Sequence, residues 1–171
     1  TDVDWWMWVD ADDIVQGAER LAEVLTSLPA DVKGLWLPYH YSRVEEDPRK
    51  PVTTLFHRER LLRTPRAGGP DWEWRHRVHE IAVPVGAKAE ELAWAETDAI
   101  VVVHQGAGHQ TEASARRNIL CLEIELEEHP DDKEVRSRSL FYLGNQYYAL
   151  GDNQTAADYY EQSLETDNPY Q

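Results

Sequence analysis

Residues 5–13 (WWMWVDADD) constrain the fold most strongly, because a run of large apolar side chains stops abruptly at a group of carboxylates. An unbroken apolar run is typical of a strand that is buried on both faces. Side chains two residues apart on a strand point the same way, so we expect Asp10 and Asp12 to face one site. Because ligands of open α/β sheets bind at the carboxyl ends of strands, these two carboxylates predict a site for Mg²⁺ or Mn²⁺.

The same carboxylates also fit the start of a helix, with Asp12 or Asp13 as the N-cap and the first turn near Ile14. The apolar positions that follow recur with the 4-3-4-3 spacing of one helix face: Ile14, Ala18, Leu21, Leu25 and Leu28. A bare D-x-D pattern is common by chance, so the metal site needs support from elsewhere in the chain.

The net charge of −15 over 171 residues argues against nucleic acid or an anionic membrane as a partner. A phosphate site in such a chain must bring its own positive charge, from a metal ion or from a local group of arginines. No apolar run is long enough for a membrane span, and no signal peptide is visible. The single cysteine, Cys121, cannot form an internal disulfide, which favours a reducing compartment and a cytoplasmic location.

Short strands are predicted in the middle of the chain by apolar stretches at residues 34–41, 52–56, 81–85 and 100–103. Pro38 lacks a backbone N–H, so we expect the first of these strands at a sheet edge or at a bulge. The last of them ends at His104. Charged residues around Pro48 predict a loop over residues 44–50, and glycines predict another over residues 105–110.

A basic island follows the second of these strands: Arg58, Arg60, Arg63 and Arg66. Guanidinium groups match phosphate oxygens, so these arginines are candidates for phosphate binding. The composition favours a bland role for most of them, covering a solvated face or pairing with nearby acids such as Glu45, Glu46 and Glu59. Arg58, which lies closest to the predicted strand end, is the first candidate.

The chain changes to a helical pattern near Ser114, and the first of these helices is expected to end near residues 129–130. Cys121 lies beside the apolar stripe of this helix, which favours a packed and inert thiol. From about Glu134 the pattern fits one tetratricopeptide unit, in which small residues let two helices approach: Gly144, Ala156 and Ser163. A generic helical hairpin is the alternative. Either must pack on the preceding helix, on further repeats or on a partner protein.

Six segments occur in order along nearly the whole chain: WMWVDADD, FHRERLLR, W-x-W…RVHE, IVVVHQG, RRNILCLEIELEEHPDD and YLGNQYYALGDNQTAADYYEQSL. Together they resemble a family-2 glycosyltransferase of GT-A fold with a tetratricopeptide-type tail. The resemblance implies an α/β class, with part of a Rossmann-like GT-A sheet over residues 1–110 and a helical tail over residues 111–171. In that family, strands that hold the nucleotide precede the D-x-D motif. Only nine residues precede Asp10, so we expect an N-terminally truncated fragment whose activity requires the complete protein.

The resemblance also implies a reaction, the inverting transfer of a sugar from a nucleotide-sugar donor with Mn²⁺ or Mg²⁺ on the diphosphate. Asp10 and Asp12 resemble the D-x-D pair that holds the metal and the diphosphate. His104 resembles the distal metal-site histidine of this family, and Glu80 resembles its acceptor-side acid. The acceptor, whether peptide, lipid or glycan, is not indicated.

Inverting transfer needs one base that takes the proton of the acceptor, and Glu80 is the first candidate, with Asp71 the second. Burial beside Trp72 or Trp74 would raise the pKa of either carboxyl group into a useful range. Glu80 could instead form a structural ion pair with a neighbouring arginine or histidine. His104 could likewise be a hydrogen-bonded histidine at a strand end, and His79 is a further possible ligand.

Two other classes of function remain as alternatives. The first is a non-catalytic tetratricopeptide adaptor whose α/β part is degenerate, for which no convergence of Asp10, Asp12, His104 and Glu80 is needed. The second is a metal-dependent phosphohydrolase, which also uses D-x-D. Enzymes resembling the haloacid dehalogenases need a lysine late in the chain, and none of the four lysines lies at the end of a predicted strand.

Overall fold

The computed structural model describes residues 3–43, 52–105 and 111–166, and it has a mixed α/β fold. The loops predicted at residues 44–50 and 106–110 lie outside the described residues. The chain divides into two compact units. The first comprises residues 1–74 and 82–109, and the second comprises residues 75–81 and 110–171. Residues 75–81 therefore belong with the helices that follow them much later in the sequence.

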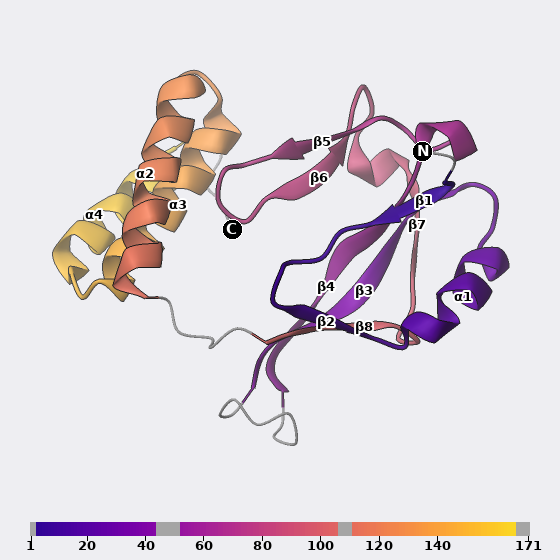
Figure 1. Ribbon diagram of the computed structural model, residues 1–171. Coiled ribbons are helices and arrows are strands. Elements are labelled where there is room, and N and C mark those ends of the chain that lie inside the picture. Colours follow the sequence, from indigo (N-terminus) through magenta and orange to yellow (C-terminus); the bar gives the residue numbers. More distant parts are fainter. Residues whose placement is uncertain (1–2, 44–51, 106–110, 167–171) are drawn as a thin grey trace. The chain divides into compact units, whose positions relative to one another are not determined.

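The first unit is built on a curled sheet of mixed direction (Figure 1). Its strands follow the spatial order β1 (Trp5–Met7), β4 (Val52–Arg63), β3 (Val32–Arg43), β8 (Val101–His104) and β2 (Asp13–Gln16), and β7 (Ala93–Glu96) also pairs with β3. The pairs β1–β4, β3–β4 and β2–β8 are antiparallel, whereas β3 runs parallel to both β7 and β8. The two long strands β3 and β4 thus lie side by side within this sheet and make most of its area.

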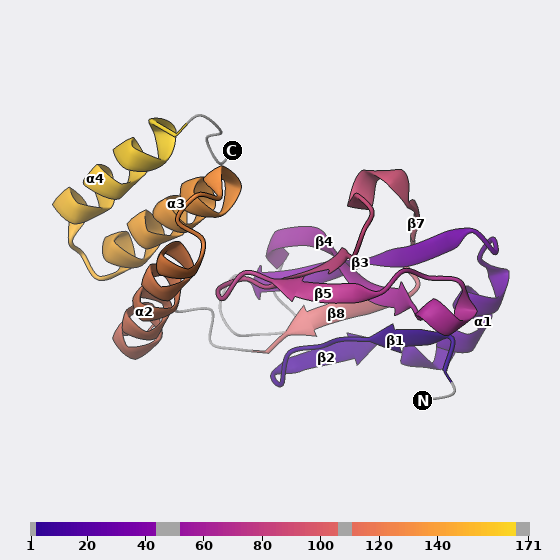
Figure 2. The same cartoon turned by 90° about the horizontal axis from the view of Figure 1, so that it is seen from above.

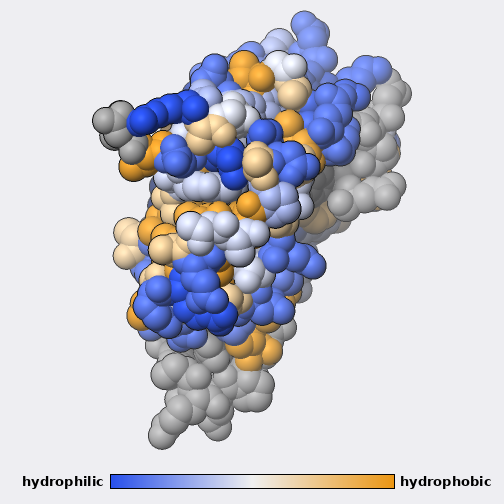
Figure 3. Space-filling view, turned by 90° about the vertical axis from the view of Figure 1, so that its right-hand side faces the viewer, coloured by the Kyte–Doolittle hydropathy of each residue, from blue (hydrophilic) through white to orange (hydrophobic). Residues whose placement is uncertain are grey.

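The core of the first unit lies on one face of this sheet, where β3, β4, β8 and the residue before β8 contribute the buried side chains. Its fully or almost fully buried members are Leu35, Leu37, Tyr39, Leu61, Ile100 and Val102. Helix α1 (Leu21–Ser27) packs its apolar side chains against this cluster. Elsewhere the surface is mixed: in the view of Figure 3, small groups of hydrophobic residues are interspersed among hydrophilic ones.

The apolar run that opens the chain is not a strand buried on both faces. Only Trp5–Met7 is a strand, at the end of the described sheet, and its side chains are half-buried. Trp5 packs toward the core cluster, whereas Trp6 and Trp8 make edge-to-face contacts with Trp74. The alternation of a single strand thus distributes these large rings over two sides.

The predicted helix from Ile14 to Leu28 is also wrong in its first half. Ile14 lies in β2, a short 3₁₀ turn covers Ala18–Arg20, and α1 begins only at Leu21. Gly17 explains the break, because its φ of 77° is left-handed and a Cβ there would overlap the carbonyl oxygen of Ala99. A residue held in that way cannot continue a right-handed helix.

Pro38 is not at a sheet edge. It lies inside β3, opposite His57 of β4, and two residues after an irregularity between Leu35 and Trp36. On its other side β3 changes neighbours at this point, from β7, which is paired up to Trp36, to β8, which is paired from Tyr39. Proline is therefore placed where that side of the strand makes no ladder hydrogen bond.

The other predicted strands are present, two of them with longer bounds. The strand expected at residues 34–41 extends over Val32–Arg43, and the one expected at residues 52–56 continues to Arg63. Three of the four island arginines therefore lie within β4. The predicted strand at residues 81–85 is β6 (Ile81–Pro84), which pairs with β5 (Trp72–Arg75).

The second unit contains α2 (Glu112–Glu128), α3 (Lys133–Ala149) and α4 (Asn153–Leu164), with α3 between the other two (Figure 2). Each helix has an N-cap side chain that accepts a backbone N–H: Thr111, Asp132 and Asp152. Helices α3 and α4 approach closely where Gly144 lies against the ring of Tyr160. The helical hairpin predicted from the sequence is confirmed. Cys121 is half-buried and packs against a cluster formed by Val78, Leu122 of α2 and Leu143 of α3.

Candidate metal centre

A tight turn that leads into β2, and not the end of a strand, carries Asp10 and Asp12. The N–H of Asp13 donates to the carbonyl of Asp10 at 3.0 Å, and the N–H of Asp10 donates back to Oδ2 of Asp13 at 3.1 Å. Aspartate suits this role because its side chain readily accepts backbone hydrogen bonds in turns. As a result Asp10 and Asp12 do not share one strand face, and Asp13, expected as a possible helix cap, begins β2 instead.

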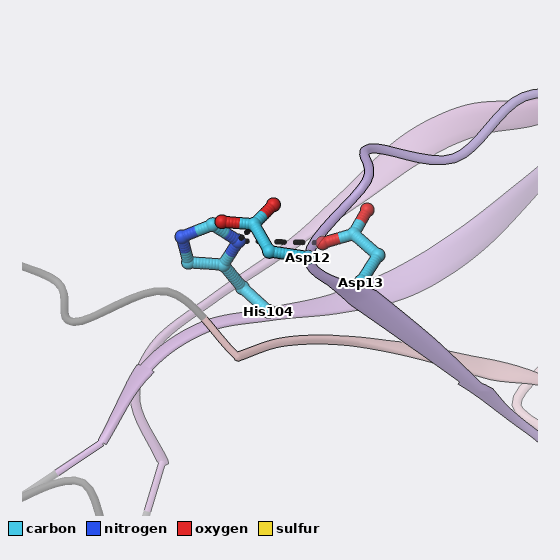
Figure 4. A group of neighbouring side chains, drawn as sticks. All are labelled: Asp12, Asp13 and His104. Carbon is cyan, nitrogen blue, oxygen red and sulfur yellow. Dashed lines mark hydrogen bonds and ion pairs between the residues drawn. The ribbon is translucent and has the colours of Figure 1, made fainter.

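Strand pairing brings His104 to this turn. In the antiparallel register of β2 and β8, Asp13 lies directly opposite His104, the last residue of β8. The Nδ1 atom of His104 is 3.3 Å from Oδ1 of Asp13 and 3.6 Å from Oδ1 of Asp12 (Figure 4). The N–H of Gln105 also donates to the carbonyl of Asp12 at 2.8 Å, which continues the pairing beyond the strand end.

Asp12, Asp13 and His104 together form a group that could hold a divalent cation. One ligand atom from each residue lies within 4.8 Å of the others. The carboxyl group of Asp12 is about half exposed, at 53%, whereas the side chain of Asp13 is fully buried and that of His104 is 17% exposed. Two carboxylate oxygens and one imidazole nitrogen fit Mn²⁺, which accepts both kinds of ligand, better than Mg²⁺, which favours oxygen alone.

Arg60 supplies positive charge behind this group. Its fully buried guanidinium reaches Oδ2 of Asp13 at 3.2 Å and Oδ2 of Asp10 at 3.3 Å. The same guanidinium lies between two rings, 3.8 Å from the centroid of Trp8 and 4.5 Å from that of Tyr39. Such a sandwich fixes the guanidinium and contributes cation–π attraction, which is strongest when water is excluded.

Tyr39 supplies a hydroxyl group to the same carboxylates. Its hydroxyl donates to Oδ1 of Asp13 at 3.1 Å and lies 3.4 Å from Oδ2 of Asp10. Burial, together with the negative charges of Asp13 and Asp10, raises the pKa of Tyr39 well above its ordinary value, so the hydroxyl stays a donor. The exposed ring of Tyr41 stacks on the imidazole of His104, with the two planes 12° apart.

The sequence-predicted ligands are only partly brought together. Asp12 and His104 meet as expected, but the third member of the group is Asp13 and not Asp10. The carboxylate of Asp10 is instead directed to Arg60 and Tyr39. Asp10 therefore contributes charge next to the group from which a cation would draw its ligands.

The predicted phosphate and base residues are not among the three members of this group. Arg58 is in the middle of β4, not at a strand end; its Nε is 3.4 Å from Oε2 of Glu59, and its guanidinium is 5.0 Å from the ring of Trp8. Asp71 is exposed and precedes β5, where its carbonyl accepts the N–H of Val85 at 2.8 Å. Glu80 is exposed within residues 75–81 of the second unit.

Sequence reasoning missed the individual importance of Asp13, Arg60 and Tyr39. A usable signal existed for two of them. Tyr39 has the same parity as the buried Leu35 and Leu37 of β3, and a polar ring at the end of such a series marks a site at the core boundary. Arg60 precedes the buried pair at residues 61–62, which indicates that its stem enters the core.

Comparison with known proteins adds no assignment, since no family model and no curated protein matches this chain. Within residues 3–43, 52–105 and 111–166, no helix combines the length and apolar character that crossing a bilayer requires.

Proposed function

We propose that this chain is part of a metal-dependent inverting glycosyltransferase of the GT-A type, joined to a tetratricopeptide-like helical unit. The observation that carries the proposal is the pairing of Asp13 with His104, which brings Nδ1 within 3.6 Å of two carboxylates at the ends of two strands. A cluster of acids alone would be weak support. The pairing of β2 with β8 adds the imidazole of His104 to the two carboxylates. Together these groups make a ligand set that suits Mn²⁺.

In this proposal Asp12, Asp13 and His104 hold the cation. When bound, Mn²⁺ would contact the diphosphate of a nucleotide-sugar donor and offset the charge that develops on it as it leaves. Arg60 and Tyr39 fix the two oxygens of Asp13, so this buried carboxylate keeps its orientation and its charge. Arg58 is proposed to contribute to phosphate binding, with its guanidinium already restrained by Trp8.

Glu80 is proposed as the base that accepts the proton of the acceptor hydroxyl, with Asp71 as the second candidate. This assignment follows the resemblance of the His79–Glu80 pair to the acceptor-side acid of the family. The exposure of Glu80 agrees with a group that must meet a soluble or surface-bound acceptor. The chemical class of the acceptor is left open.

A tetratricopeptide adaptor is the second candidate, because α3 and α4 present large exposed side chains. Tyr148 is 66% exposed and Leu164 is 68% exposed. An adaptor, however, has no use for cation binding by Asp12 and His104, so metal affinity separates the two functions.

The first test is a titration of the protein with Mn²⁺, followed by electron paramagnetic resonance of the free ion. We expect Asp12→Asn and His104→Ala to weaken Mn²⁺ binding by at least about tenfold, as is usual when a ligand is lost. The chain offers a matched control, the surface pair of His57 and Asp98, whose Nε2 and Oδ1 lie 3.8 Å apart. His57→Ala and Asp98→Asn should leave the affinity unchanged.

The second test asks for turnover. The complete protein is incubated with a panel of nucleotide sugars, with and without Mn²⁺, and release of the nucleoside diphosphate is measured. Hydrolysis or transfer that requires Mn²⁺ and is lost in Asp12→Asn supports the proposal. Equal Mn²⁺ affinity of the wild type and both site variants would refute it and would favour the adaptor.

A further inference from the structure

Side chains from two helices bind the backbone of residues 75–81 in the second unit. The N–H of Arg77 donates to Oε1 of Glu125, on α2, at 3.2 Å. From α3, Nη2 of Arg138 donates to the carbonyl oxygens of Val78 and His79, at 2.9 and 3.0 Å. Backbone contacts of this kind fix the path of the chain whatever side chains it carries.

The groups that make these contacts are buried and have little freedom to move. Glu125 accepts from the ring of His76 at 3.2 Å on Oε1 and from the hydroxyl of Ser139 at 2.8 Å on Oε2. The side chains of His76 and Glu125 are 5% and 4% exposed, and Arg138 is 5% exposed. Buried charges are costly unless they are hydrogen-bonded, so these contacts define one arrangement sharply.

Apolar and aromatic contacts add to the same arrangement. Val78 is buried among Leu122 and Leu143 in the helical core. The ring of His79 lies 4.8 Å from that of Tyr142, which also receives the guanidinium of Arg138 at 4.6 Å. The helices thus hold a segment that comes from far earlier in the sequence.

The held segment has an unusual backbone. His76 and His79 have φ values of 70° and 56°, in the left-handed region that non-glycine residues rarely adopt. Such conformations persist only where the surroundings determine them strongly, and they are common where a functional side chain must be presented. The residue that follows the second of them is Glu80, which is exposed.

We infer that Glu125 and Arg138 are positioning residues for Glu80, and that the helices fix the backbone from which this acceptor-side base projects. The inference rests on the proposed function, because it takes Glu80 as the base. Neither Glu125 nor Arg138 needs to touch substrate, since both act through the backbone of residues 77–79. The helices thereby determine the backbone conformation of the residues that lead to Glu80.

The test compares two variants with two matched controls in the complete protein. Glu125→Gln weakens the acceptor of the Arg77 N–H. Arg138→Lys keeps the charge, but its side chain is one bond shorter, so the ammonium falls short of the two carbonyl oxygens that Nη2 reaches. The controls are Glu128→Gln, which removes an exposed ion pair to Arg77 from the same helix, and Arg136→Lys, at an exposed position of α3.

Hydrogen exchange, followed by mass spectrometry, measures how firmly the backbone of residues 77–80 is held. We expect both variants to speed exchange over residues 77–80 by about tenfold, the effect of losing one buried hydrogen bond, while α2–α4 stay protected. The controls should remain within about twofold of the wild type, as surface substitutions do. If Glu125→Gln unfolds the helices, Ser139→Ala, which removes only the bond to Oε2, takes its place. Unchanged exchange over residues 77–80 would overturn the inference.

Turnover reads the positioning of Glu80. With UDP-glucose or UDP-N-acetylglucosamine as the donor, water as the acceptor and Mn²⁺ present, Glu80→Gln and both variants should lower kcat by about tenfold or more. The donor KM and the Mn²⁺ affinity should not change. A general loss of structure would change both of them, so this result separates mispositioning of Glu80 from unfolding. Unchanged kcat in Glu125→Gln and Arg138→Lys would contradict the positioning role.

The same experiment separates the two proposals. Full turnover in Glu80→Gln, together with loss in Asp12→Asn, would refute the inference and leave the proposed function intact. Absence of Mn²⁺-dependent turnover in the wild-type complete protein, over the whole donor panel, would contradict the proposed function and with it the catalytic part of the inference. The exchange measurement decides independently whether the helices hold the loop.

Discussion

The side chains of Arg60 and Asp13 are both fully buried, and they form an ion pair with Nη2 3.2 Å from Oδ2. The partners come from β4 and from the start of β2, which are not neighbours in the sheet order. This pair therefore connects the acidic turn to the central strands, and it places a permanent positive charge behind the oxygens that a cation would use. Its removal should affect folding as well as binding.

Arg60→Met should destabilise the first unit strongly, because it leaves the carboxylate of Asp13 buried without its partner. Loss of one member of a buried pair costs about 3–5 kcal/mol. Urea unfolding measures the effect, and Arg58→Met is the control, because Arg58 also stacks on Trp8 but is only half-buried. The double variant Arg60→Met/Asp13→Asn should recover part of the loss. Equal stabilities of Arg60→Met and Arg58→Met would show that the buried pair has no special role.

Tyr39→Phe should weaken Mn²⁺ binding without removing any ligand. The hydroxyl of Tyr39 orients Oδ1 of Asp13 from 3.1 Å, and loss of such an orienting hydrogen bond lowers metal affinity by about tenfold. Paramagnetic titration measures the change. Tyr41→Phe keeps the ring stacked on His104 and serves as the control, for which we expect an unchanged affinity. Equal affinities of the two variants would contradict the orienting role of Tyr39.

Much of the helical unit could be predicted from the sequence, because its signals are local. The spacing of apolar residues, the prolines and the small residues at Gly144 and Ser163 all act within a few turns of helix. The placement of His104 at a strand end was also correct, since an apolar β-branched run stops there. Such patterns depend on residues that are close in sequence, so they can be recognised without knowledge of the tertiary contacts.

The acidic turn could not be predicted in the same way, because its geometry depends on distant residues. Asp13 and His104 are 91 positions apart, and only the register of β2 and β8 joins them. Gly17 ends the apparent helical pattern through its contact with Ala99, which no local signal records. The sequence also predicts that the strand ends at Phe56, because Arg58 and Arg60 are charged. The strand continues through both residues, since Arg60 is buried and paired with Asp13.

Glu125 should make the stability of the second unit depend on acid pH. Burial alone raises the pKa of Glu125, but hydrogen bonds from His76 and Ser139, the charge of His76 and the N–H of Arg77 together lower it below its ordinary value of 4.5. A lowered folded-state pKa stabilises the fold above the unfolded value, and this stabilisation is lost as the pH falls through the folded value.

The expected result is a difference between Glu125→Gln and the wild type that shrinks as the pH falls. Urea unfolding at about pH 7 and about pH 3.5, followed by helix circular dichroism, measures it. Glu127→Gln, at an exposed position of the same helix, is the control and should show no such convergence. A constant difference between Glu125→Gln and the wild type at both values would mean that the carboxylate charge does not stabilise the unit.

Gly144→Ala should destabilise the helical hairpin, although alanine is the better helix former. A Cβ at this position would overlap the ring of Tyr160, whose hydroxyl is fixed by a 2.8 Å bond to Oδ1 of Asn145. Overpacking of this kind costs about 1–3 kcal/mol, more than the helix-propensity gain of about 1 kcal/mol. In a Tyr160→Leu background the smaller side chain leaves room, so the same substitution should become neutral or stabilising. Thermal unfolding of the four proteins measures this change of sign, and a Gly144→Ala effect that is equal in both backgrounds would show that the close approach of α3 and α4 does not depend on this contact.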